Sequence, residues 1–142
     1  MYLKFPTSLD FPALATAICA ELTEDRIEWD YENVYEWMLL DLPELDYSLN
    51  VSREHGLADV DDASLDRHAD NDAELQKLVK RGPVYVFGWH RETSTLVNDL
   101  PDSLAQMLAN RLAVDVHVHP GRIAIDQPDS PPTAVFKPDS GK

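Results

Sequence analysis

The chain opens with an amphipathic pattern that predicts a helix over residues 8–23. Its apolar positions recur at the spacing that brings them onto one helical face. They are Phe11, Leu14, Ala15, Ile18 and Leu22. Ser8 or Asp10 can cap the start, and Pro12 suits the first turn, where its missing N–H costs nothing. Cys19 follows Ile18 near the apolar face, so we expect this thiol to pack in the core rather than to act as a nucleophile.

Residues 26–53 are predicted to form a strand region. Positions 45–52 alternate strictly between apolar and polar side chains, which is typical of a half-buried strand. Positions 34–41 are rich in aromatic and branched residues, and 42–44 can turn the chain back, which favours a hairpin. Because segment 30–41 also fits a helical period, a helix remains the alternative there, and we prefer the strand.

The middle of the chain is predicted to contain a loop, a short helix and a central strand. Residues 54–70 are rich in aspartate and poor in large apolar groups, whereas 72–81 fit a helix. Residues 84–90 are apolar on both alternating faces, so we expect both faces of this strand, including Phe87, to be covered. Residues 93–97 can form its hairpin partner.

A second amphipathic helix is predicted over residues 101–112, and a strand over 114–119. From position 127 onward four prolines stand among mainly polar neighbours, which is typical of a tail or surface strap. We therefore divide the chain into a single acidic domain, 1–127, and a Pro-rich C-terminal tail or strap, 128–142. The expected fold is α+β, with a mostly antiparallel sheet of four to six strands and two or three helices packed on one face.

The net charge is the compositional feature that says most about the function of the chain. The chain carries 26 Asp and Glu against 12 Lys and Arg, a net charge of −14, and 19 of the acidic residues lie in the first 75 positions. A field of one sign repels nucleic acid and anionic membranes and attracts basic proteins. We therefore expect a basic protein partner, such as a toxin or nuclease, with no direct nucleic-acid binding and no membrane association.

The N-terminal segment lacks the pattern of a secretory signal, and no apolar run approaches the roughly 18 residues of a membrane span. Cys19 is the one cysteine in the sequence and cannot form an internal disulfide, which fits a reducing compartment. We expect the protein to be cytoplasmic.

Two short segments carry side chains suited to chemistry. Asp115, His117 and His119 would project from one face of a strand, where a divalent metal could bind them. We prefer a solvent-facing polar side for that strand and expect neither a metal nor a cofactor. At the end of the 84–90 strand, Glu92 could orient His90 as a general base, but no nucleophile motif accompanies them. We therefore expect no enzymatic activity.

The acidic and aromatic stretch 21–47 is the candidate partner-binding region. Carboxylates steer a cationic partner, and Trp and Tyr supply desolvated anchors in interfaces. The candidate residues are Glu28, Trp29, Asp30, Tyr31, Glu32, Tyr35, Glu36 and Asp46. The alternative is that the aromatic side chains form the core while the carboxylates face water.

Size, acidity and the lack of a catalytic set favour an acidic protein-binding inhibitor that covers the active cleft of a basic toxin or enzyme. This profile resembles that of bacterial immunity and antitoxin proteins as a class, but no motif carries a residue role across. One alternative is an adaptor or assembly protein that binds a non-toxic partner. Another is a metal-dependent enzyme that uses Asp115, His117 and His119.

Overall fold

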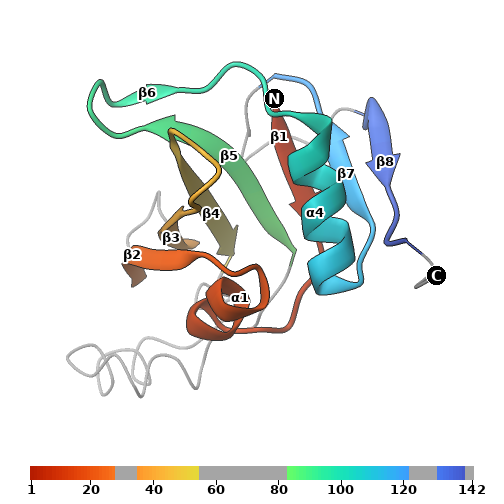
Figure 1. The fold of residues 1–142 in the computed structure, drawn as a ribbon, viewed down its shortest axis with the longest axis horizontal. Coiled ribbons are helices and arrows are strands. Elements are labelled where there is room, and N and C mark those ends of the chain that lie inside the picture. Colours follow the sequence, from red (N-terminus) through yellow and green to blue (C-terminus); the bar gives the residue numbers. More distant parts are fainter. Residues whose placement is uncertain (28–34, 55–82, 122–130, 140–142) are drawn as a thin grey trace, which may run out of the picture.

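The computed structural model describes residues 1–27, 35–54, 83–121 and 131–139. In it, eight short strands pair into one antiparallel sheet (Figure 1). The strands are β1 (Tyr2–Phe5), β2 (Glu21–Ile27), β3 (Tyr35–Asp41), β4 (Ser48–Glu54), β5 (Val84–His90), β6 (Thr95–Leu96), β7 (Val116–His119) and β8 (Ala134–Phe136). Two helices accompany them in these residues, α1 (Phe11–Ala17) and α4 (Asp102–Leu112). The predicted α+β class is confirmed. The sheet is larger than the four to six strands expected, because β1, β2 and β8 were not anticipated.

The strand order is β2-β3-β4-β5-β1-β7-β8, and β6 pairs with the end of β5. Strands β2 to β5 form an antiparallel meander, so the predicted hairpin of β3 and β4 is confirmed. Strand β1 lies between β5 and β7 and is antiparallel to both. Strands β5 and β7 therefore run in the same direction, and α4 forms the crossover between them.

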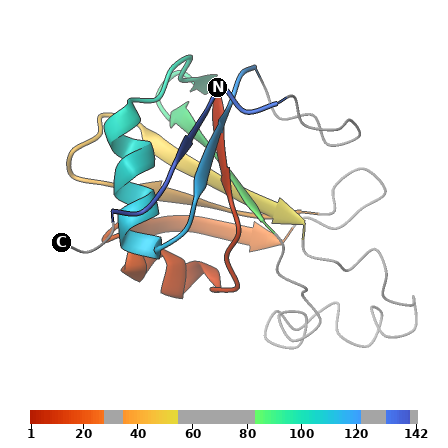
Figure 2. The ribbon, with the colours of Figure 1, turned by 90° about the vertical axis from the view of Figure 1, so that its right-hand side faces the viewer.

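Both helices pack on the same face of the sheet, as predicted (Figure 2). Every second side chain of a strand points to this face. For example, Leu3 of β1 lies opposite Val86 and Val118, and all three are buried. The helices contribute Phe11, Leu14, Ala15, Leu104, Ala105, Leu108 and Ala109. No helix within the described segments is long and apolar enough to cross a membrane.

Helix α1 begins where the sequence predicted and ends earlier. The Asp10 carboxylate accepts a hydrogen bond from the Ala13 N–H at 2.9 Å, and Pro12 lies in the first turn. The prediction of a helix to residue 23 is wrong, because the helix stops at Ala17 and β2 begins at Glu21.

The end of α1 is a Schellman motif built on Cys19. The Ala20 N–H donates to the Ala15 carbonyl at 2.9 Å, and the Cys19 N–H donates to the Thr16 carbonyl at 3.1 Å. Cys19 adopts a positive φ of 58° and is exposed. The prediction that this thiol packs in the core is therefore wrong, because the left-handed residue after a helix turns its side chain out of the apolar stripe.

Strand β5 is confirmed, but its two faces differ. Val84 and Val86 are buried on the helix-covered face, whereas Phe87 on the other face is only half-buried, so it is not covered as fully as predicted. Gly88 permits a close approach on the buried face. A Cβ at position 88 would lie only 2.7 Å from the Cβ of Val97. The backbone N–H of Val97 donates a hydrogen bond to the Gly88 carbonyl at 3.0 Å.

The C-terminal region adds an edge strand to the sheet. Strand β8 pairs with β7, and Phe136 packs against the core cluster. The sequence pattern predicted a Pro-rich tail or surface strap over 128–142 and gave no signal for this strand. The predicted 72–81 helix and all but the first residue of the predicted 54–70 loop lie outside the described residues.

Candidate partner-binding surface

The predicted partner-binding residues lie in four different settings. Residues 28–32, which supply five of the eight, lie outside the described part of the chain, and Tyr35 is the first residue of β3. Asp46 is exposed in the turn between β3 and β4. Glu36 differs from the prediction, because its side chain is buried on the helix-covered face.

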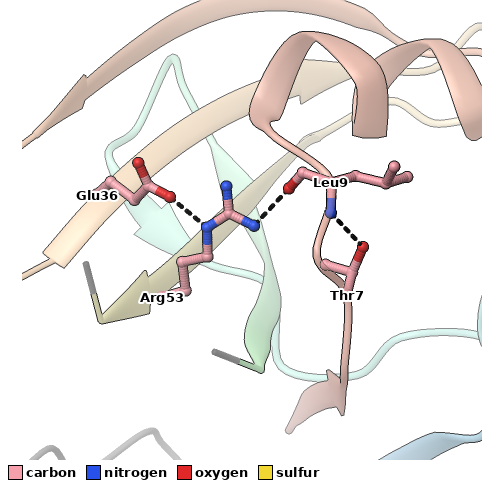
Figure 3. Close-up of polar contacts among 4 residues, drawn as sticks. All are labelled: Thr7, Leu9, Glu36 and Arg53. Carbon is pink, nitrogen blue, oxygen red and sulfur yellow. Dashed lines mark hydrogen bonds and ion pairs between the residues drawn. The ribbon is translucent and has the colours of Figure 1, made fainter. Parts of the chain in front are cut away.

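Glu36 forms an ion pair with Arg53, its direct cross-strand neighbour in β4 (Figure 3). The Arg53 Nε donates to Glu36 Oε1, and its Nη1 donates to the Leu9 carbonyl at 2.6 Å. The guanidinium carbon also lies 4.8 Å from the centroid of the Phe11 ring. The pair thus joins β3 and β4 to the segment that enters α1.

The exposed fractions of the two side chains show whether Glu36 and Arg53 can contact a partner. Glu36 is 1% and Arg53 0% exposed, so neither side chain is on a surface that a partner could reach. The described contacts of this pair are with other parts of the fold, namely β3, β4 and the segment before α1. Glu36 is therefore a structural residue, in contrast to the prediction.

The β3–β4 turn and the β5–β6 turn both lie near the C-terminal end of β5 (Figure 1). Residues of both turns line an open groove. Its volume is ≈ 680 Å³. It is lined by Asp41, Leu42, Pro43, Leu45, Asp46, Tyr47, Ser48, His90, Arg91, Glu92 and Thr93. We call it the acidic groove, because three of these side chains are carboxylates and one is a guanidinium.

The β3–β4 turn forms one wall of the acidic groove. The Leu45 N–H donates to the Leu42 carbonyl at 3.1 Å, and the buried Leu42 side chain anchors the turn in the core. The Ser48 hydroxyl donates to Asp41 Oδ1 at 2.6 Å, which joins the two ends of the turn. These contacts leave Asp46 exposed at the rim.

The β5–β6 turn forms the opposite wall. Arg91 Nη1 lies 3.7 Å from Asp41 Oδ2 and donates to the Thr23 hydroxyl oxygen at 3.1 Å, which links this turn to β3 and β2. The Arg91 and Asp41 side chains are both 44% exposed, so their ion pair contributes little stability. Glu92 is exposed, and no hydrogen bond joins it to His90 among the described residues.

Aromatic rings of Tyr47 and His90 meet between the two walls. Their centroids are 6.1 Å apart in an edge-to-face arrangement. The Tyr47 hydroxyl is buried and makes no hydrogen bond with any described residue. Burial raises the pKa of Tyr47 above its usual value, and the nearby Asp46 carboxylate raises it further.

The Asp115, His117 and His119 set does not converge in the fold. The Asp115 carboxylate pairs with Lys137 Nζ at 3.0 Å. His119 is buried and stacks on the Tyr2 ring at 4.9 Å, with the His117 ring 6.2 Å away on its own strand. Burial of His119 differs from the solvent-facing position predicted for it. No group of three or more potential metal ligands occurs within the described residues.

Comparisons with protein-family models, curated proteins and solved structures found no match to this chain.

Proposed function

We propose that this protein is an acidic inhibitor, of the immunity or antitoxin kind, that neutralises a basic toxin or enzyme by covering its active cleft. The acidic groove carries the proposal. It places three carboxylates around a concave surface of a chain whose net charge is −14. A surface of that charge raises the encounter rate with a cationic partner.

The groove also offers what an interface needs beyond charge. Its lining includes the exposed Pro43 and the half-buried Leu45 and Tyr47. Apolar and aromatic groups of this kind supply binding energy when they are desolvated, while rim carboxylates act mainly on the association rate. Asp46 and Glu92 stand on two different turns, so a partner that contacts both must span the groove.

The same surface could serve an adaptor or assembly protein, which would bind a basic partner without inhibiting it. The metal-dependent enzyme is not favoured by the described geometry, because the Asp115 carboxylate is engaged by Lys137. We place the protein in the cytoplasm on the basis of its single cysteine, and we expect it to bind neither nucleic acid nor membranes.

The proposal can be tested by capture of the partner with a matched pair of baits. The groove variant is Asp46→Asn/Glu92→Gln, and the control variant, Asp99→Asn/Asp102→Asn, removes two charges outside the groove. The intact protein and the control variant should retain a basic protein from a lysate of the native cells, and the groove variant should retain much less. The purified partner should lose its activity with one equivalent of the intact protein.

A partner that is bound at the groove with full activity would support the adaptor instead. Equal capture by the groove and control variants would contradict the role of this surface.

A further inference from the structure

We propose that the acidic groove binds the side chain of one arginine from the partner. This inference rests on the proposed function and specifies the chemistry of its central contact. A guanidinium group matches three features of the groove. They are carboxylates that make no ion pair with a described residue, a pair of aromatic rings, and a buried hydroxyl that has no hydrogen-bond partner among the described residues.

The first feature is the state of the rim carboxylates. Arg91 is engaged by Asp41 and by the Thr23 hydroxyl. Asp46 and Glu92 make no ion pair with any described residue, although both line the groove. Carboxylates that line a groove can accept charge-assisted hydrogen bonds from a guanidinium, which presents five N–H donors in a planar fork.

The second feature is the ring pair. Tyr47 and His90 lie edge to face with their centroids 6.1 Å apart, and both line the groove. A guanidinium stacks on aromatic rings and is less strongly hydrated than an ammonium group. The site should therefore prefer arginine over lysine.

The third feature is the Tyr47 hydroxyl, which is buried in the groove wall without a described hydrogen-bond partner. A buried polar group without a partner is uncommon in folded proteins. This oxygen can accept a hydrogen bond from a guanidinium N–H once the β3–β4 turn moves and uncovers it. The groove volume of ≈ 680 Å³ falls within the roughly 300–1,000 Å³ of small-molecule sites, so the side chain can enter.

The test is an NMR titration of the isotope-labelled full chain with N-acetyl-arginine amide, and separately with N-acetyl-lysine amide. The arginine probe should shift the backbone amides of 45–48 and 90–93 with saturation in the millimolar range, and the lysine probe should bind at least about threefold more weakly. The Asp46→Asn/Glu92→Gln variant should weaken arginine binding about tenfold, whereas Asp99→Asn/Asp102→Asn should leave it unchanged. The spectra of the variants themselves report whether each is folded.

Three results would overturn the inference: arginine shifts spread over the whole acidic surface, equal binding of the lysine probe, or equal weakening in the control variant. The proposed function fails separately. If the probe does not bind but partner capture still depends on Asp46 and Glu92, the arginine site is wrong and the inhibitor proposal stands. If the probe binds and capture is indifferent to those carboxylates, the partner does not use this groove.

Discussion

Strand β3 carries a carboxylate–guanidinium pair near each end, and the two pairs lie in opposite environments. Glu36 and Arg53 are at most 1% exposed, and Arg53 also donates to the Leu9 carbonyl. Asp41 and Arg91 are 44% exposed and 3.7 Å apart, at the edge of the acidic groove. Because five positions separate Glu36 from Asp41, alternation directs the two carboxylates to opposite faces of the sheet.

This difference shows that burial, rather than residue type, decides what an ion pair does. In the interior each charge has lost its hydration, so removal of one partner leaves an uncompensated charge. At the surface water replaces a lost partner, and the carboxylates act at long range on whatever approaches. We therefore assign the first pair to stability and the surface carboxylates to binding.

The largest expected effect is the loss of the buried guanidinium. Arg53→Ala should lower the free energy of unfolding by about 3–5 kcal/mol, because it leaves the Glu36 carboxylate buried and opens a cavity. Arg91→Ala should cost less than about 1 kcal/mol. Urea denaturation of both variants measures the two values. Similar losses in the two variants would remove the distinction between the pairs.

Replacement of both buried charges should recover much of that loss. Glu36→Leu/Arg53→Met removes the two desolvated groups together and fills their space with apolar atoms, which is often neutral or stabilising for buried pairs. We expect the double variant to be more stable than either single variant, although the Leu9 carbonyl loses its hydrogen bond. A double-mutant cycle by urea unfolding checks this, and additive losses would show that the pair is not coupled.

A substitution that leaves the charge unchanged should alter the structure near the acidic groove and leave the region of Glu36 and Arg53 unchanged. Gly88→Ala forces Val97 away from β5, since the added Cβ would lie 2.7 Å from the Val97 Cβ. We expect a loss of roughly 1–3 kcal/mol from overpacking, with shifted amide resonances at 90–93 and little change around Glu36 and Arg53. Shifts of equal size at both ends would mean that the two regions are mechanically linked.

The smallest effect should appear at alkaline pH. The pKa of Tyr47 is raised in the native state, so above pH 10 the unfolded chain ionises first and the free energy of unfolding falls as pH rises. Tyr47→Phe should reduce this alkaline loss and be close to neutral at pH 7, where it removes a hydroxyl without a described hydrogen bond. Unfolding curves between pH 8 and pH 11 measure the slope, and an unchanged slope would contradict the assignment.

Local patterns predicted the fold better than they predicted the site. Apolar alternation identified β4, β5 and β7, and the aromatic and branched residues before a turn identified β3. The helical period identified α4 and the start of α1. The end of α1 was missed because Cys19, rather than glycine, occupies the left-handed position. Strand β8 was missed because its three residues lie among prolines.

The candidate site depends on contacts between distant parts of the chain. Glu36 shares its parity with Met38 and Leu40, a signal that could have placed it on the buried face. That Arg53 is the partner of Glu36 can be known only from the register of β3 with β4. The groove is formed by two turns, 42–47 and 91–94, that are distant in the sequence. In the sequence, Asp46 is a candidate partner-binding residue and Glu92 is a neighbour of His90, and nothing there places the two together.

The association kinetics of the captured partner test the central claim most directly. At roughly 50 mM salt, Asp46→Asn/Glu92→Gln should slow the association rate constant about three- to tenfold relative to the intact protein, and the difference should shrink at roughly 500 mM salt. Asp99→Asn/Asp102→Asn, with the same net charge, should associate almost as fast as the intact protein. Association rates that fall equally in the two variants, or in neither, would contradict a binding role for the acidic groove.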